Sequence, residues 1–323
     1  MKKLLVLVAL VALLQSPIPA NAEASANTIR NVSVGDSPIS IVVDATAKKV
    51  FVAVEYSKIK VINEKTGKFS RVTGYDRMPL DMALDEVRHE IYVTNLETND
   101  ISVIDVASNR VTSTIPVEDS FQGTNDLMGV AVDSARGRVY VTFWPAGSLL
   151  VFDTKTKALI KTVTLANGVS GVAVEPSTGR ICVSNGNTGT VTILEPKTWT
   201  TFATIKVGKE PTEISIDANG VAYVSNFASN SVSMIEIKTK KLMRTIKVGL
   251  GPLALALRSK TSELYVANFL GDSVSVISTK TMQVTRTFKG ASHPRDIQVN
   301  GLTGVAYIAN MWSGVLWTVG DRD

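Results

Sequence analysis

The sequence ELYVANFLGDSVSVIS at residues 263–278 decides the fold, because close copies of it recur along the chain. It reads as a strand that ends in Asn268, a short turn and a second strand. Related text begins at Val221 (VAYVSNFASNSVSMIE) and at Glu90 (EIYVTNLETNDISVID). A strand pair that returns at intervals indicates a repeat architecture rather than a chain of unrelated domains.

Seven copies of the first of these strands define the period of the repeat. Their last positions lie 41, 48, 42, 41, 42 and 42 residues apart, and each unit offers three further strand-like segments rich in Val, Ile and Thr. Units of 40 to 45 residues with four strands are typical of propeller blades. The sequence therefore predicts an all-β fold, a seven-bladed β-propeller. The copies are VFVAV (50–54), IYVTN (91–95), VYVTF (139–143), ICVSN (181–185), AYVSN (222–226), LYVAN (264–268) and AYIAN (306–310).

The two ends of the chain predict how the ring closes. After Asn310 there is text for one more strand, so the seventh blade lacks its outer strand. The segment TIRNVSVGDSP at 28–38 matches the outer-strand text TIKVGKEP at 204–211 and TIKVGLGP at 245–252. We therefore expect Thr28–Val34 to complete the last blade and to leave no long open sheet edge.

The repeat resembles the YVTN β-propeller repeat family, whose name is spelled at Tyr92-Val93-Thr94-Asn95. The resemblance covers the chain from residue 23 onward and implies a propeller fold of an exported bacterial protein. It implies little about activity, because propellers perform many unrelated tasks. Copies one and three depart from the pattern, with Val54 and Phe143 in place of Asn.

The N-terminus has the layout of an export signal. Two lysines precede an apolar run at 4–14, two prolines end it, and Ala20-Asn21-Ala22 fits a cleavage site. The run is far shorter than the roughly 20 residues of a membrane helix. We expect a signal peptide at 1–22, a propeller domain at 23–323, and export to the periplasm, the cell surface or the extracellular medium.

Charge and cysteine content exclude some classes of function. The chain carries 34 Lys and Arg against 29 Asp and Glu, a net charge of +5. This weak balance does not indicate a nucleic-acid partner. The single Cys182 excludes an internal disulfide, and its place in the aromatic column of the repeat predicts a buried, inert thiol.

Three columns of the repeat are expected to serve the scaffold or the channel. The Tyr column, which includes Tyr92 and Tyr265, alternates with Val and Ile and predicts packing between blades. The Asn column predicts local hydrogen bonds in the turn. A third column, at the start of each first strand, contains three acids that we expect as solvated carboxylates near the mouth of a central channel; a cation site there is the alternative. This column is Ser40, Asp81, Gly129, Gly171, Glu213, Ala254 and Asp296.

Candidate binding residues gather on one side of the ring. We call it the top face, formed by the loops between second and third strands and by the loops that lead into each first strand; the other side is the bottom face. Loops usually expose small polar residues, so aromatic rings here need an explanation. They either bind a ligand or partner or fold inward and plug the channel. The one large insertion, at 117–126, lies on the same face. The predicted binding residues are Phe121, Trp144, Phe227, Phe269, His293, Arg295, Asp296 and Trp312.

No pattern for catalysis, a metal or a cofactor is strong. The two histidines, His89 and His293, are expected on opposite faces, which argues against a multi-histidine metal site. There is no haem-attachment motif and no nucleophile elbow. The best catalytic arrangement would pair His293 with Asp296 or Glu213 as acid and base on the rim, as in seven-bladed lyases of the streptogramin type.

The sequence leaves three functions open. The first is an exported, monomeric, non-catalytic propeller without cofactor that binds a protein, glycan or small ligand in the cell envelope. The second is a lyase or hydrolase at the channel mouth. The third is a propeller subunit of a periplasmic redox complex whose cofactors are held by a partner.

Overall fold

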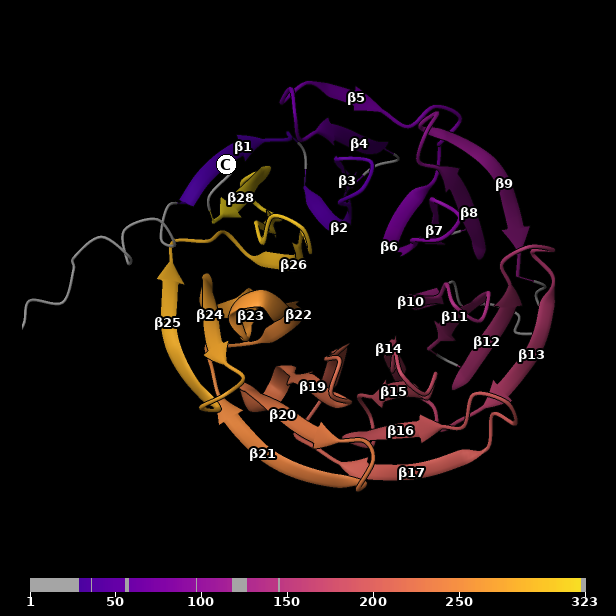
Figure 1. Ribbon diagram of the computed structural model, residues 1–323, viewed down its shortest axis with the longest axis vertical. Helices are drawn as coiled ribbons and strands as arrows, with labels where there is room; N and C mark the ends of the chain where they lie inside the picture. Colours follow the sequence, from indigo (N-terminus) through magenta and orange to yellow (C-terminus); the bar gives the residue numbers. More distant parts are fainter. Residues whose placement is uncertain are drawn as a thin grey trace, which may run out of the picture.

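Seven four-stranded antiparallel sheets form a ring around a central channel in the computed structural model (Figure 1). The structure describes residues 29–35, 37–55, 58–96, 98–117, 127–144 and 146–320. The expected signal peptide and the cleavage site lie outside these residues. The first strand of each blade lines the centre of the ring and the fourth lies at the circumference. The predicted all-β, seven-bladed propeller is therefore confirmed.

The first four blades follow one another along the chain. Blade 1 contains β2 (Pro38–Asp44), β3 (Lys49–Val54), β4 (Lys58–Asn63) and β5 (Phe69–Arg71). Blade 2 contains β6 (Met78–Asp85), β7 (Glu90–Leu96), β8 (Asp100–Asp105) and β9 (Arg110–Pro116). Blade 3 contains β10 (Leu127–Asp133), β11 (Arg138–Phe143), β12 (Ser148–Asp153) and β13 (Leu159–Thr164). Blade 4 contains β14 (Val169–Val174), β15 (Ile181–Asn185), β16 (Thr190–Leu194) and β17 (Thr201–Lys206).

The last three blades include the short helical turns and the closure. Blade 5 contains β18 (Pro211–Ile216), β19 (Val221–Asn226), the 3₁₀ turn η1 (Phe227–Ser229), β20 (Ser231–Glu236) and β21 (Lys241–Lys247). Blade 6 contains β22 (Pro252–Arg258), η2 (Ser259–Thr261), β23 (Glu263–Asn268), η3 (Phe269–Gly271), β24 (Ser273–Ser278) and β25 (Gln283–Lys289). Blade 7 contains β26 (Pro294–Val299), β27 (Ala306–Asn310), β28 (Val315–Val319) and, as its fourth strand, β1 (Ile29–Ser33).

The start of the chain closes the ring, as predicted. Strand β1 pairs antiparallel with β28 from Ile29 opposite Val319 to Ser33 opposite Val315. The indigo and yellow ends of the chain therefore lie side by side in Figure 1. Blade 7 gains a complete fourth strand from the other end of the sequence, and its β28 is paired on both sides.

The core lies between neighbouring blades. Each cluster of buried apolar residues draws on two adjacent sheets, and the cluster at the closure joins Ile41 and Val52 of blade 1 to Tyr307 and Leu316 of blade 7. The whole Tyr column, Cys182 included, is buried, which confirms the packing role predicted for it. Burial also raises the pKa of the Cys182 thiol, so this sulfur is a poor nucleophile.

The Asn column is used inside the scaffold. The Asn226 amide donates to the hydroxyls of Ser231 and Ser233 and its carbonyl accepts the Gly208 N–H at 3.0 Å. Asn268 repeats the two donated bonds in blade 6. Local hydrogen bonding, the role predicted from sequence, is therefore confirmed in these blades.

Candidate functional site

The inner end of every blade carries an irregular register near the top face. In each first strand the pairing with the second strand shifts two or three residues after the strand begins, for example between Pro79 and Asp81 and between Pro294 and Asp296. A bulge of this kind changes the direction of side chains. The column that contains the three acids lies at these bulges and so faces the neighbouring blade as well as the channel.

Hydroxyl groups tie successive blades together beside the bulges. Thr94 donates to the carbonyl of Met128 at 3.1 Å, and Ser225 donates to the carbonyl of Leu253 at 3.0 Å. The equivalent Ser184 donates to Thr212. Each bond links a second strand to the first strand of the next blade. The residue before the Asn column of the repeat is therefore part of the ring's framework in blades 2, 4 and 5.

Two of the acids make the same kind of link with carboxylate oxygens. Asp81 accepts the N–H of Val130 in blade 3 at 3.0 Å and the N–H of Met82 at 2.8 Å. Asp296 accepts the N–H of Ile41 across the closure and that of Ile297, both at 2.6 Å.

The third acid and a neighbouring arginine complete this ring of contacts. Glu213 interacts with the N–H of Leu255 in blade 6. Arg295 is half-buried and its Nε donates to the carbonyl of Ile39 at 3.3 Å, again across the closure. Arg295 and Asp296, both predicted as binding residues, thus serve the junction of blades 7 and 1.

Burial and mutual repulsion perturb the three channel acids. Burial, followed by the charges of Asp296 and Asp81, holds the pKa of Glu213 well above its usual range. Burial and the charge of Asp81 raise the pKa of Asp296 to about 7. Burial likewise raises the pKa of Asp81, although its hydrogen bonds oppose the shift. The expectation of solvated carboxylates was wrong for Asp296, which is buried and bonded to two backbone N–H groups. Asp81 is half-buried and bonded to the next blade, and Glu213 is half-buried and borders the channel cavity.

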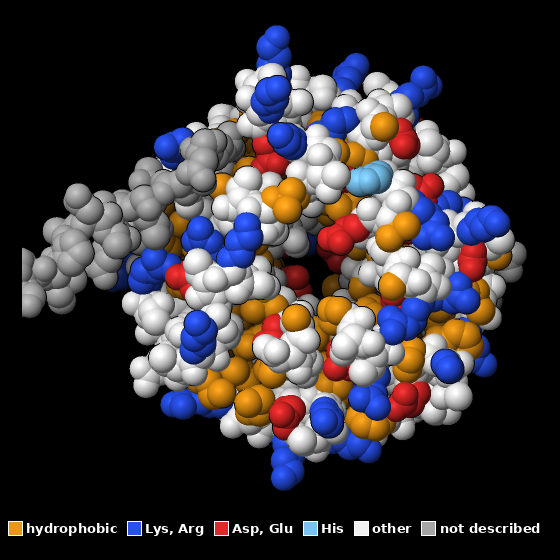
Figure 2. Space-filling model, viewed as in Figure 1, with side chains coloured by type: hydrophobic (Ala, Val, Ile, Leu, Met, Phe, Trp, Pro, Cys, Tyr) orange, Lys and Arg blue, Asp and Glu red, His pale blue; other side chains and the backbone are white. Residues whose placement is uncertain are grey.

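The channel itself is hollow below the acids. A cavity of about 520 Å³ runs along the first strands of blades 3 to 7, bordered by small apolar residues such as Val172, Ala173 and Ala256 and by Glu213. Figure 2 shows the hollow at the centre of the ring, with acidic and hydrophobic side chains around it. Among the described residues, no group of three or more His, Cys, Asp or Glu is arranged to hold a metal ion.

Three of the predicted binding residues meet on the top rim between blades 6 and 7. The His293 and Trp312 rings stack with centroids 3.6 Å apart and planes 12° apart. Phe269 meets the His293 ring edge-on at 5.0 Å. We call Phe269, His293 and Trp312 the rim platform. Trp312 is 69% exposed, so one face of its ring is supported by the imidazole and the rest is open to solvent.

His293 is held by a partner that the sequence did not suggest. Its Nδ1 lies 3.2 Å from Oδ1 of Asp272, and the same oxygen accepts the His293 backbone N–H at 2.9 Å. The oxygens of Asp296 are bonded to Ile41 and Ile297 instead. The predicted acid–base pair of His293 with Asp296 or Glu213 is therefore not the pairing in the structure, because η3 brings Asp272 of the neighbouring blade closer.

The other predicted aromatics lie apart from the platform. Trp144 follows β11 in blade 3 and is 42% exposed, while Phe227 opens η1 in blade 5 and is half-buried. Tyr75, in the top-face loop before β6 and not among the predicted binding residues, turns inward, and its hydroxyl donates to Asn95 at 2.7 Å. Phe121 lies outside the described residues. The top-face aromatics thus divide into inward-packed rings and open ones.

Two exposed leucines lie beside the platform and were not among the residues predicted from the sequence. Leu250 is 57% exposed and Leu270 is 54% exposed. They lie in neighbouring loops, where a Cβ added at Gly251 would approach Leu270 at 2.7 Å and one added at Gly271 would approach the Leu250 backbone at 2.9 Å. The recurring Leu-Gly pairs in the sequence were the available signal.

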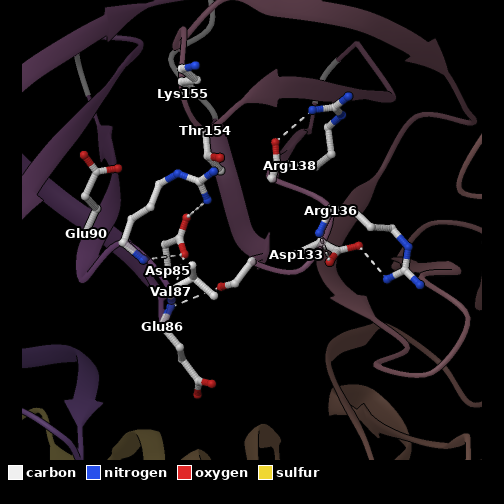
Figure 3. A network of polar contacts seen from close by, with 12 residues as sticks. Asp85, Glu86, Val87, Glu90, Asp133, Arg136, Arg138, Thr154 and Lys155 are labelled. Atoms are coloured by element: carbon white, nitrogen blue, oxygen red, sulfur yellow. Dashed lines mark hydrogen bonds and ion pairs between the residues drawn. The ribbon is translucent and has the colours of Figure 1, made fainter.

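The bottom face has a different character, dominated by ion pairs within and between turns (Figure 3). Arg88 pairs with Asp85 and Arg136 with Asp133, each at 3.0 Å and three residues apart. The Glu86 N–H donates to Ser134 of the next blade at 3.1 Å. His89 lies on this face, 2.7 Å from Asp44, far from His293 as predicted. These charges are engaged in holding turns, whereas the top face exposes apolar rings.

The fold of the chain is shared with a protein of known structure. The chain is a seven-bladed β-propeller, and its structure aligns with Kuenenia stuttgartiensis hydrazine synthase at a TM-score of 0.77 and 13% identity, over 90% of this chain and 97% of that one. At this identity the likeness shows the fold alone. No protein-family model matches the chain.

One relative is similar in sequence. Over 142 residues the chain is 28% identical to the uncharacterized protein YncE of Escherichia coli O157:H7, a match that covers 44% of this chain and 35% of YncE. The match therefore spans well under two thirds of the length of YncE. The repeat, the fold and this match together support a YncE-like β-propeller protein. No helix among the described residues is long and apolar enough to span a membrane.

Proposed function

We propose that this protein is an exported, non-catalytic, monomeric binding propeller that holds a ligand or partner of the cell envelope on its rim platform. The observation that carries the proposal is the exposed Trp312 ring, fixed from behind by His293. An exposed aromatic ring in a fixed orientation loses little side-chain entropy when a ligand covers it. Aromatic anchors of this type commonly supply most of the binding energy of an interface.

The surroundings of Trp312 support a binding surface rather than a solvated rim. Leu250 and Leu270 add apolar area near the platform, and Asp272 adds a half-exposed carboxylate beside His293. An apolar centre with a polar margin is the usual composition of a recognition site. Trp144, in blade 3 across the channel, serves as a separate contact for an extended partner.

We infer export of the protein from the sequence of residues 1–22. A short apolar run after two lysines, followed by Ala20-Asn21-Ala22, is typical of a cleaved signal peptide. We place the mature protein in the periplasm or beyond it, where the rim platform meets envelope components.

The test is affinity capture from an envelope extract, made in parallel with wild-type protein and two variants. Trp312→Ala should reduce the retained ligand at least tenfold with little change in thermal midpoint, because the ring is an exposed anchor. Leu302→Ala is the matched control, since Leu302 is 62% exposed in a bottom-face turn, and it should retain the ligand fully. If Trp312→Ala and the wild type retained the same amount of ligand, the rim platform would not be the binding site. If the loss of ligand in Trp312→Ala came with a large fall in its thermal midpoint, Trp312 would be a packing residue.

The same preparation separates binding from the two alternatives. A lyase or hydrolase at the channel mouth would lose turnover of the captured ligand in His293→Ala, so ligand conversion that depends on His293 would replace the proposal. A subunit of a redox complex would co-purify with a coloured partner. Retention of an unaltered, colourless ligand supports the binding function.

A further inference from the structure

A groove of about 630 Å³ opens at the circumference where blades 7 and 1 meet. One side is the end of the closing strand, at Ser33, Val34 and Gly35, and the other is formed by Lys58 and Lys60 of β4 and by β5. It lies at the outside of the ring, and no residue of the rim platform or of the channel cavity borders it, although Val34 and Gly35 bond to Gly314, two residues from Trp312. Its volume falls within the range of small-ligand sites, roughly 300–1,000 Å³.

The groove exists because the outer strand of blade 1 is unusually short. Strand β5 pairs with β4 over Lys60–Ile62, and one further bond runs from the Val72 N–H to the carbonyl of Ile59. In blade 2 the outer strand β9 follows β8 from Asp100 to Asp105. After Val72 the chain departs toward blade 2, where the Thr73 N–H donates to the carbonyl of Asn109 at 2.9 Å. The outer end of β4 therefore has no fourth strand across Lys58.

Three cationic side chains and one aromatic ring border this space. Lys58 and Arg71 are exposed, and no salt bridge engages either of them within the described residues. Lys60 donates to the carbonyl of Val34 and so ties β4 to the closing strand. The Phe69 ring is 50% exposed on the same side. It occupies the outer-strand position at which blades 3, 5 and 6 expose the aliphatic Leu159, Leu242 and Val284, so blade 1 places an aromatic ring there instead.

We propose that this seam groove binds a small organic anion that carries a planar ring. The anionic group, a phosphate or a carboxylate, interacts with Lys58 and with the guanidinium of Arg71, which can donate two parallel hydrogen bonds to such a group. The ring of the ligand lies against Phe69. Because the groove includes residues of both blades 7 and 1, the bound anion stabilises the closed ring. The inference is independent of the rim platform.

The experiment uses the mature protein with three probes that separate ring from charge. Adenosine 5′-monophosphate carries both, adenosine carries the ring alone, and inorganic phosphate carries the charge alone. Calorimetric titration and thermal midpoints should show adenosine 5′-monophosphate binding with a Kd of about 1 mM or tighter, and each of the other probes binding at least tenfold more weakly.

Variants test the residues of the groove. The double variant Lys58→Gln, Arg71→Gln should weaken binding of adenosine 5′-monophosphate at least tenfold, and Phe69→Ala should bring its affinity to that of inorganic phosphate. The matched control is Leu159→Ala, Lys161→Gln, which alters an exposed apolar and an exposed cationic residue of the outer strand β13 and should leave binding unchanged.

Three results would overturn the proposal. They are the absence of binding by adenosine 5′-monophosphate at millimolar concentration, binding that the groove variants leave unchanged, and equal loss of binding in the control variant. Binding to anionic phospholipid vesicles without binding to the nucleotide would also overturn it and would assign the cations to a membrane surface.

Discussion

At the scale of single residues, the ring depends on the absence of side chains where neighbouring first strands approach each other. Gly129 and Gly171 occupy the column that holds acids in blades 2, 5 and 7. A Cβ added at Gly171 would lie 2.3 Å from the carbonyl oxygen of Thr212 in blade 5, and one at Gly129 would lie 2.8 Å from the carbonyl of Ser170. Both contacts involve backbone atoms, which cannot rotate away.

Gly171→Ala should therefore lower the free energy of unfolding by about 1–3 kcal/mol, the usual effect of overpacking a close contact. The matched control is Gly301→Ala, because no atom lies within 4 Å of a Cβ at Gly301. The control should change stability by less than about 0.5 kcal/mol. Urea denaturation of both variants and the wild type measures the difference, and equal midpoints for all three would contradict the close approach seen at blade 4.

At the scale of elements, the closing strand β1 contributes more than its length suggests. Its five residues pair with β28, and Val34 directly after it is buried against blade 1. The Val34 N–H also donates to the carbonyl of Gly314 at 2.9 Å. Each net hydrogen bond contributes about 1 kcal/mol, so the ring gains several kcal/mol from a segment distant in sequence.

A chain truncated to begin at Gly35 should show a lower thermal midpoint and faster amide exchange in β28. A synthetic peptide of residues 29–34 should restore both by adding a strand to the open edge. A peptide of scrambled sequence is the control and should restore neither. A truncated chain as stable as the full one would show that β1 does not contribute to closure.

Much of the element-level structure could be predicted because the repeat reports it seven times. The spacing of the Asn-ending strand fixed the blade number, and the outer-strand text at 28–38 located the closure. The position of β1 followed from pattern matching alone. The shortness of β5 could not be anticipated in the same way, because it depends on where the chain departs to reach blade 2.

The candidate site was predictable in part. The sequence identified Phe269, His293 and Trp312, which meet on the rim. It could not identify Asp272 as the partner of His293, because these residues lie 21 positions apart in different blades and meet through the curvature of the ring. It also placed Asp296 on the rim, whereas the bulge in β26 directs that carboxylate into the junction between blades 7 and 1.

At the scale of the whole molecule, the channel acids make stability depend on pH. Asp81, Glu213 and Asp296 all have a pKa above its ordinary value, chiefly because of burial. The folded protein thus binds protons more tightly than the unfolded chain, in which carboxyl groups titrate near pH 4. Their contribution to stability is greatest below about pH 4 and is lost as pH rises through the folded values, which extend to about 7 for Asp296.

The variant Glu213→Gln isolates this effect, because glutamine has nearly the same shape as the protonated acid and can still accept the Leu255 N–H. At pH 5 the variant and the wild type should have similar thermal midpoints. At pH 8 the thermal midpoint of the variant should be higher than that of the wild type by about 2 °C or more. The wild type must then either ionise Glu213 beside the charges of Asp81 and Asp296 or keep Glu213 protonated at a pH where the unfolded chain is ionised, and both cost free energy. Glu86→Gln, on an exposed bottom-face turn, is the control and should follow the wild type at both pH values. If the difference in thermal midpoint between Glu213→Gln and the wild type did not grow between pH 5 and pH 8, the three carboxyl groups would titrate as ordinary solvated acids. Their protonation would then not stabilise the junctions between blades 2 and 3, 5 and 6, and 7 and 1.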